Sequence, residues 1–293
     1  MRTISISKIR LSGARRLRRV SIRLIPLIVG SIMLGYSSGV VYMLAIENSL
    51  VYAPAAPAEE WCAQPSGIED VSFRTGDGRM DAWYCPAKEP AGVILMCHGK
   101  AGNLSVRGKW MLRFRDLFNC SVLVFDYPGY GYSEGEPSES GCYAAADAAY
   151  DWLLREKHFR PDQIVIYGES LGGGVAVDLA SRRPCAGMLL VNTFDDLPSV
   201  AQRLYPWLPV VPLMRNRFDS VNKIGLIHAP IFVTHAGADE LITFGQFKRL
   251  FAAIAAPKEG LVRPGKKHED PLTPSELRRM RDFLVRCHCL PSR

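Results

Sequence analysis

Residues 168–172 read Gly168-Glu169-Ser170-Leu171-Gly172, which fits the pattern G-x-S-x-G. The apolar run 164–167 precedes this pentapeptide, and a segment with helical spacing, 171–182, follows it. A serine placed between a buried strand and a helix, with glycines on both sides, is typical of a sharp turn that presents a nucleophilic hydroxyl. We therefore expect Ser170 to be a nucleophile and not merely a helix cap.

Short apolar runs alternate with helical segments on both sides of this turn. The runs are 93–97, 122–125, 164–167, 187–191 and 231–234, and the helical segments are 104–118, 139–156, 171–182, 244–254 and 274–285. This alternation predicts an α/β protein with a mostly parallel sheet and helices on both faces. Before it, 71–75 and 80–85 flank a glycine-rich turn and predict an antiparallel hairpin.

A serine hydroxyl needs a base, which is normally a histidine oriented by a carboxylate. His268 is the histidine that lies beyond the last strand-like run and before the final helix, where the order serine, acid, histidine would place the base. Asp239 follows run 231–234 and is the expected acid. Asp195 and Asp196 after the preceding run are alternatives, and Glu240 is a weaker one.

Backbone amides can stabilise the oxyanion that forms during acyl transfer. Leu171, which follows the nucleophile, would supply one N–H, and Lys100 in the segment 98–103 would supply the other. We expect His98 to orient this segment and not to act as a second base. The sequence contains no H-E-x-x-H, P-loop or dinucleotide-binding motif, so we expect neither a metal nor a cofactor.

Four further segments carry a resemblance to a known family. Residues 98–103, 126–137, 205–209 and 217–220 resemble the Bem-type membrane-anchored α/β hydrolases, whose relatives include depalmitoylating abhydrolases and serine-aminopeptidase-like hydrolases. The resemblance spans about residues 48–285. It implies the α/β-hydrolase fold and a triad of Ser170, Asp239 and His268. Members usually carry Asn in place of Lys100 and Ser where Asp195 and Asp196 stand, so the substrate stays open.

These residues predict a serine hydrolase that cleaves a carboxylic ester or thioester, with a small-molecule or lipid-like acyl ester as substrate. One alternative is an aminopeptidase-like enzyme on the same triad, for which Asp195, Asp196 or Glu169 would bind the substrate amine. Another alternative is a catalytically silent binding protein on the same scaffold. The intact triad argues against the silent protein.

The N-terminal residues predict a membrane anchor. Residues 1–23 carry eight Lys or Arg and no acid, so the formal charge of +7 leaves −1 for the rest of the chain, and no nucleic-acid partner is expected. Residues 24–46 contain no charge and are long enough to cross a bilayer. Since basic flanks stay inside, we expect a cytoplasmic N-terminus and an extracytoplasmic catalytic domain. A signal cleaved near residues 56–58 and a twin-arginine signal are alternatives.

The expected organisation is a basic tail over 1–23, a signal anchor over 24–46, an extended linker over 47–60 and a catalytic domain over 61–293, with a small lid at 194–228. The eight cysteines have no spacing typical of a zinc ribbon or a disulfide-rich scaffold. We expect a buried thiol at Cys97. Cys62 with Cys85 is a conceivable disulfide, and Cys287 and Cys289 near the C-terminus are the most free to pair.

Overall fold

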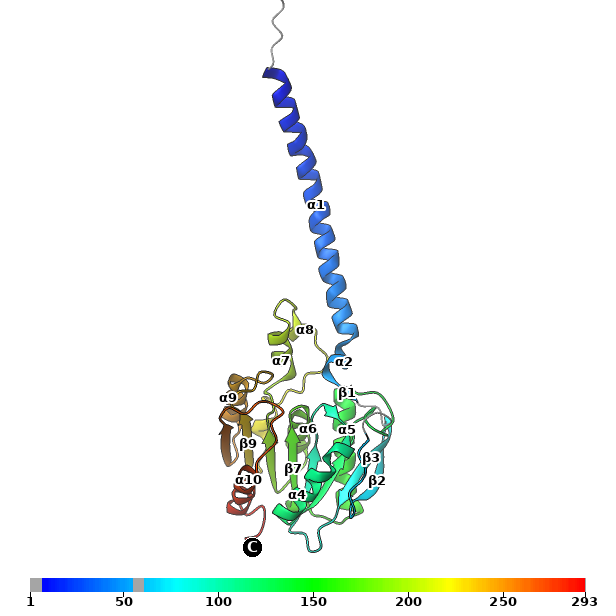
Figure 1. Ribbon diagram of the computed structural model, residues 1–293, viewed down its shortest axis with the longest axis vertical. Coiled ribbons are helices and arrows are strands. Elements are labelled where there is room, and N and C mark those ends of the chain that lie inside the picture. Colours follow the sequence, from blue (N-terminus) through cyan, green and yellow to red (C-terminus); the bar gives the residue numbers. More distant parts are fainter. Residues whose placement is uncertain (1–6, 55–60, 293) are drawn as a thin grey trace, which may run out of the picture. The chain divides into compact units, whose positions relative to one another are not determined.

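The computed structural model describes residues 7–54 and 61–292, which divide into two compact units, Met1–Glu47 and Asn48–Arg293. The first unit contains helix α1 (Ser7–Ala45), drawn in blue in Figure 1. Its part Pro26–Ala45 has a mean hydropathy of 1.7 and is long enough to cross a membrane, a property that an N-terminal signal sequence shares. Leu27, Ile32 and Leu34 on this helix are exposed.

The second unit is built around an eight-stranded sheet with the order β10-β9-β8-β7-β4-β6-β3-β2. All neighbouring pairs from β10 to β6 are parallel, while β6, β3 and β2 pair antiparallel. The predicted mostly parallel sheet with an antiparallel hairpin is therefore confirmed. The strands are β2 (Glu69–Thr75), β3 (Gly78–Cys85), β4 (Val93–Cys97), β6 (Ser121–Phe125), β7 (Ile164–Glu169), β8 (Gly187–Val191), β9 (Ile231–Ala236) and β10 (Lys258–Arg263).

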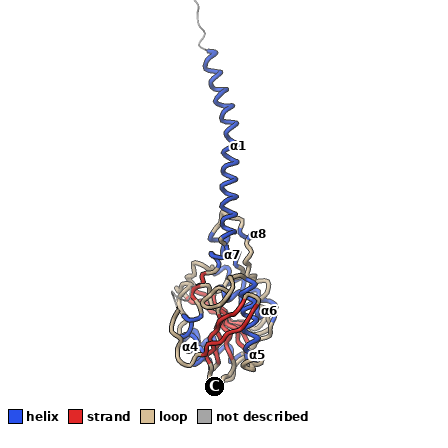
Figure 2. The backbone as a smooth tube through the Cα atoms, turned by 90° about the vertical axis from the view of Figure 1, so that its right-hand side faces the viewer, coloured by secondary structure: helices blue, strands red, loops and turns tan. Residues whose placement is uncertain are grey.

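Helices cover both faces of this sheet, as predicted. On one face α4 (Gly108–Phe118) and α10 (Pro274–Arg286) share a buried apolar cluster with the strands, and on the other face α5 (Glu139–Arg155), α6 (Leu171–Arg182) and α9 (Phe244–Ala253) share a second cluster. Figure 2 shows α4 on one side of the strands and α5 and α6 on the other. Strands β4, β6 and β8 are buried along their whole length because both faces are covered.

Two parts of this architecture differ from the sequence prediction. Strand β10 was not predicted, since its six residues contain only two adjacent apolar side chains and its position at the sheet edge leaves most of them partly exposed. The predicted helix 104–118 begins as a 3-10 turn, η1 (Leu104–Arg107), before α4. A second 3-10 turn, η2 (Pro161–Gln163), leads into β7.

The start of the second unit differs from the expected linker over 47–60. Residues Glu47–Val51 form the short helix α2, and β1 (Ala53–Pro54) pairs in parallel with β5 (Ala101–Gly102). The Tyr52 side chain between them is buried in the core beside α5 and α6. Residues 48–54 are thus part of the folded unit, and 55–60 lie outside the described residues.

The predicted lid segment, 194–228, connects β8 to β9 and contains α7 (Leu197–Leu204), α8 (Val210–Leu213) and the 3-10 turn η3 (Ile224–Leu226). Figure 1 places α7 and α8 beyond the carboxyl ends of the central strands. Ile224 and Phe218 belong to the core cluster, so the base of the segment is packed firmly.

All eight cysteines are free thiols. The suggested pairing of Cys62 with Cys85 is wrong, because Cys85 is buried at the end of β3 while Cys62 lies exposed in the segment before β2. Cys287 and Cys289 are also unpaired. Cys97 is fully buried as predicted, and burial raises the pKa of its thiol well above the ordinary range.

Candidate active site

The pentapeptide 168–172 forms a sharp turn between β7 and α6. Ser170 has φ 50° and ψ −117°, a backbone conformation that is costly for a residue with a side chain. A Cβ at Gly172 would lie 2.1 Å from the carbonyl oxygen of Cys97. Glycine at position 172 therefore allows α6 to begin directly against the end of β4, which lifts Ser170 to the sheet edge.

Three predicted residues from distant parts of the chain meet at this edge. The Oγ of Ser170 lies 2.9 Å from Nε2 of His268, and Nδ1 of His268 lies 2.7 Å from Oδ2 of Asp239. The side chain of Asp239 is fully buried, and that of His268 is 12% exposed. The histidine is thus in hydrogen-bonding range of both the hydroxyl and the carboxylate, as base catalysis requires.

Asp239 is fixed in place by the backbone that follows it. Its Oδ1 accepts hydrogen bonds from the N–H groups of Leu241 (2.9 Å) and Ile242 (2.8 Å), which leaves Oδ2 for His268. Burial alone would raise the pKa of Asp239, but the hydrogen bonds from His268 and from these two amides outweigh it and lower that pKa. Asp239 is therefore ionised when it faces the imidazole.

The pKa of His268 is moved in the opposite direction. Burial alone would lower it, but the hydrogen bond and charge of Asp239, with smaller contributions from Glu269 and Glu169, raise it above the ordinary value. The two glutamates stand next to His268 and Ser170 in the sequence. The imidazole accordingly has a strengthened affinity for the proton that it would take from the serine.

The alternative acids lie elsewhere and have other partners. Asp195 is buried and accepts hydrogen bonds from Arg249 Nε (2.5 Å) and Gln246 Nε2 (3.1 Å) on α9. Asp196 caps α7 by accepting the N–H of Ser199 at 2.7 Å. Glu240 follows Asp239 directly and is exposed, whereas the Asp239 side chain is buried against His268.

The segment 98–103, which we call the oxyanion loop after its expected role, runs beside Ser170. A Cβ built on Gly99 would lie 3.6 Å from the Cβ of Ser170, so the neighbouring Lys100 is close to the turn. Leu171 is the first residue of α6, where a helix leaves its N–H without an intrahelical acceptor. Both residues expected to donate to an oxyanion are thus brought to the same edge of the sheet as Ser170.

The buried side chains of His98 and Asp126 lie beside the oxyanion loop. Nε2 of His98 lies 3.2 Å from Oδ1 of Asp126, with both side chains fully buried, and the same carboxylate oxygen accepts the N–H of Leu104 at 2.7 Å. The hydroxyl of Tyr127 donates to the His98 carbonyl at 2.8 Å. Burial raises the pKa of Asp126. This arrangement fits the orienting role expected of His98.

The first residues of the second unit, 50–53, also contact the oxyanion loop. Strand β1 pairs Ala53 with Ala101, and Nζ of Lys100 donates to the Leu50 carbonyl at 3.0 Å. The hydroxyl of Tyr130 donates to the Lys100 carbonyl at 3.0 Å and accepts the N–H of Ala53 at 3.1 Å. The backbone around Lys100 is therefore held by Ala53 of β1 and by Tyr130.

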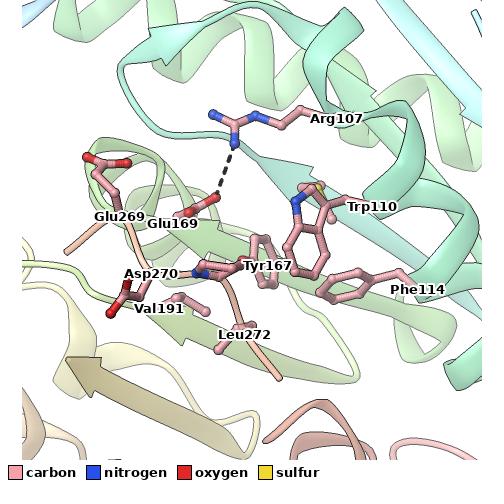
Figure 3. Close-up of a pocket in the computed structure, with 11 residues that line it drawn as sticks. Arg107, Trp110, Phe114, Tyr167, Glu169, Val191, Glu269, Asp270 and Leu272 are labelled. Carbon is pink, nitrogen blue, oxygen red and sulfur yellow. Dashed lines mark ion pairs between the residues drawn. The ribbon is translucent and has the colours of Figure 1, made fainter. Parts of the chain in front are cut away.

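Arg107 links the oxyanion loop to the turn, a role that the sequence did not reveal. Its Nη2 donates to the Ala101 carbonyl at 3.1 Å, and its Nη1 lies 3.7 Å from Oε2 of Glu169 (Figure 3). Both groups line a pocket of about 110 Å³ together with Trp110 and Glu269. Aromatic side chains from α4 form one wall of this pocket, and charged groups next to Ser170 and His268 form another.

Asn192 is a second residue whose role the sequence did not reveal. Its Nδ2 donates to the His268 carbonyl at 2.7 Å, and its Oδ1 accepts the N–H of Ala236 at 2.9 Å. It adopts φ 46°, a conformation that asparagine tolerates better than most residues. Asn192 thus ties the loop of His268 to the end of β9.

Within residues 7–54 and 61–292, no group of three His, Cys, Asp or Glu side chains is arranged to hold a metal ion.

Comparison with known proteins agrees with this architecture. Residues 92–225 match the family model of the α/β-hydrolase fold. The chain is 37% identical over 248 residues to the uncharacterized protein Rv2307c of Mycobacterium tuberculosis, covering 83% of this chain and 88% of that one. It is 32% identical to α/β-hydrolase domain-containing protein 17B of Xenopus laevis, covering 76% and 77%. The esterase Pf2001 of Pyrococcus furiosus shares the fold, with a TM-score of 0.65 at 17% identity over 81% of this chain and 98% of that one. The chain therefore belongs to the α/β-hydrolase family.

Proposed function

We propose that the protein is a membrane-anchored serine hydrolase that cleaves a carboxylic ester or thioester through an acyl-enzyme on Ser170. The observation that carries this proposal is the continuous contact from Asp239 through His268 to Ser170, at 2.7 and 2.9 Å. The resemblance to depalmitoylating abhydrolases and to the Bem-type membrane-anchored hydrolases supports a lipid-like acyl substrate.

The chemistry proceeds in two halves. The Oγ of Ser170 attacks the acyl carbon while Nε2 of His268 takes its proton, and the N–H groups of Leu171 and Lys100 stabilise the oxyanion. His268 then returns the proton to the leaving alcohol or thiol, which leaves an acyl-serine. Water then attacks the acyl carbon while His268 takes its proton. The bond to Oγ breaks, the carboxylic acid leaves and His268 returns the proton to Ser170. Asp239 stays ionised throughout and stabilises the imidazolium.

The rival peptidase would need a free carboxylate for the substrate amine. Two of the three candidates are already engaged, Asp195 by Arg249 and Gln246 and Asp196 as the cap of α7. Glu169 is paired with Arg107. These pairings favour an ester or thioester over an aminoacyl substrate.

Labelling with a fluorophosphonate probe tests the proposal. We expect the full chain to react and the Ser170→Ala and His268→Ala variants to lose reaction. A panel of p-nitrophenyl esters, acyl thioesters and aminoacyl anilides then separates the substrate classes. Labelling that persists in Ser170→Ala, or cleavage of anilides alone, would contradict the proposal.

We also propose that α1 is an uncleaved anchor with the basic tail 1–23 in the cytoplasm, the span at 24–46 and the catalytic domain on the extracytoplasmic side. The eight basic residues before the span support this orientation. Cleavage near residues 56–58 would remove the buried Tyr52 and the strand β1 that holds the oxyanion loop. Protease added to sealed spheroplasts or inside-out vesicles tests the topology, and digestion of the catalytic unit only in the inside-out vesicles would contradict it.

A further inference from the structure

The tip of the lid exposes an unusual set of apolar side chains. Leu204 is 48% exposed, Trp207 57%, Val211 46% and Leu213 39%. We call these four residues the lid tip. Contiguous exposed apolar residues in a folded protein mark a surface that another apolar phase covers.

The charged residues within the lid segment are of one sign. Residues 197–218 contain Arg203, Arg215 and Arg217 and no Asp or Glu. All three arginines are exposed. Glu139 and Glu240 contact the base of the segment, at Arg217 and Arg203. A segment that combines exposed apolar residues, a tryptophan and arginines has the composition of one that lies at the interface of an anionic bilayer.

Three backbone groups between Trp207 and Leu213 bond to side chains of the lid segment. Nε2 of Gln202 donates to the Leu208 carbonyl at 2.9 Å, and its Oε1 accepts the N–H of Val210 at 3.2 Å. Nη1 of Arg217 donates to the Val211 carbonyl at 2.9 Å. In a bilayer, unpaired backbone groups are costly, so this internal pairing suits a turn that enters lipid.

The lid is also tied to the residues that follow the membrane-spanning part of α1. Nδ2 of Asn216 donates to Oδ1 of Asn48 at 2.9 Å, and its Oδ1 accepts the hydroxyl of Tyr52 at 2.7 Å. Asn48 is three residues beyond Ala45, where α1 ends. Three residues span at most about 11 Å. An anchored protein therefore keeps Asn216 near the bilayer surface.

We infer that the lid tip docks into the leaflet in which α1 is anchored and that the site accepts its acyl ester from that leaflet. The inference rests on the proposed membrane anchor and on the proposed ester substrate. Docking would lower the cost of moving an acyl chain to Ser170, since the chain would pass from lipid along apolar side chains and not through water.

Tryptophan quenching in lipid nanodiscs tests the docking. The full chain is placed in nanodiscs of phosphatidylcholine and phosphatidylglycerol, with or without bromine on the acyl chains. Trp207 is the one tryptophan of the lid, and 24–46 contains none. We expect bromolipid to quench the wild type and Trp152→Phe alike, and Trp207→Phe clearly less. Trp152, half-buried on α5, makes the matched control.

Substrate transfer is tested with Leu204→Ser, Val211→Ser and Leu213→Ser combined in one protein. We expect hydrolysis of nanodisc-borne p-nitrophenyl palmitate to fall at least about threefold, because three exposed apolar contacts with lipid are lost. Hydrolysis of soluble p-nitrophenyl acetate should not change. Ser170→Ala should lose hydrolysis of both the palmitate and the acetate ester, which would support the proposed chemistry.

Three results would overturn the inference. The first is equal quenching in Trp207→Phe and wild type, and the second is an unchanged rate of palmitate hydrolysis in the triple variant. The third is a cross-linked dimer that disappears in the triple variant, because it would show that a second copy of the chain covers the lid tip. Each leaves acetate hydrolysis by Ser170 intact, so it is distinct from failure of the proposed chemistry. Failure of that chemistry would instead appear as acetate hydrolysis unaffected by Ser170→Ala.

Discussion

Arg107 lies 3.7 Å from Glu169 and also donates to the Ala101 carbonyl, so one guanidinium joins the residue before Ser170 to the oxyanion loop. These two segments must keep a fixed separation if the N–H groups of Leu171 and Lys100 are to bind the same oxyanion. The planar guanidinium has several N–H donors and can serve both partners at once.

Replacing Arg107 should therefore impair the chemical step. We expect Arg107→Gln to lower kcat about tenfold with little change in KM, less than the roughly 10² to 10³ lost with an oxyanion donor itself. Arg107→Lys should recover part of the loss. The matched control is Arg155→Gln, whose side chain is 76% exposed on α5. A higher KM with an unchanged kcat would exclude a role of Arg107 in positioning the oxyanion loop.

The pH dependence should report the charges around His268. The imidazole must be neutral to act as a base, so kcat/KM falls as pH drops through the pKa of His268 in the free enzyme. Because the charge of Glu269 helps to raise that pKa, Glu269→Gln should move the acid limb of the profile to lower pH. The movement should shrink at high salt, since Glu269 is exposed.

A matched control is Asp162→Asn, because Asp162 is exposed before β7, at the opposite end of that strand from Ser170. Its profile should coincide with that of the wild type. An acid limb that moves to higher pH in Glu269→Gln would contradict the assignment of His268 as the titrating base.

The fold and the three meeting side chains followed from local signals in the sequence. The buried strands are uninterrupted apolar runs, and the order of Ser170, Asp239 and His268 along the chain agrees with the positions that the sheet topology gives them. Edge strand β10 escaped prediction because an edge strand needs few apolar residues. The linker expected over 47–60 rests on Pro54 and Pro57, which favour an extended backbone. Strand β1 at Ala53–Pro54 is also extended, so its pairing with β5 leaves no separate mark in the sequence.

The supporting residues could not be predicted for a different reason. Arg107 and Asn192 act through backbone carbonyls of Ala101 and His268, and such partners leave no mark in the residue types of the sequence. The one faint signal was that Asn192 directly follows an apolar run. The disulfide suggested between Cys62 and Cys85 failed because Cys85 is buried at the end of β3 and Cys62 is exposed, a difference that the sequence does not show.

Asn192 should matter for both stability and activity. We expect Asn192→Ala to lower the free energy of unfolding by about 1–3 kcal/mol, because buried partners lose their hydrogen bonds and alanine is strained at φ 46°. Asn192→Gly relieves the strain but not the lost bonds. If the His268 loop depends on these bonds, both variants lose kcat, while only Asn192→Ala carries the additional loss of stability. Urea unfolding with steady-state kinetics separates the two effects, and a Gly variant with full kcat would contradict the positioning role.

The start point of a shortened protein should decide whether it works. A chain that begins at residue 48 keeps Tyr52, β1 and the contact of Lys100 with Leu50, whereas one that begins at residue 59 loses all of them. We expect the first to react with a fluorophosphonate at the rate of the full chain and the second to react at least about tenfold more slowly, because the oxyanion loop loses its contact with residues 50–53.

Tyr52 variants of the full chain keep the membrane anchor, so they separate the effect of weakening the contact of residues 50–54 with the oxyanion loop from the effect of losing the anchor. Tyr52→Ala should cost about 3–5 kcal/mol of stability by opening a cavity in the core, and Tyr52→Phe should cost only about 1 kcal/mol through the lost hydrogen bond to Asn216. Thermal unfolding measures both changes. Equal probe reactivity of the chains that begin at 48 and at 59 would mean that the oxyanion loop holds its shape without β1.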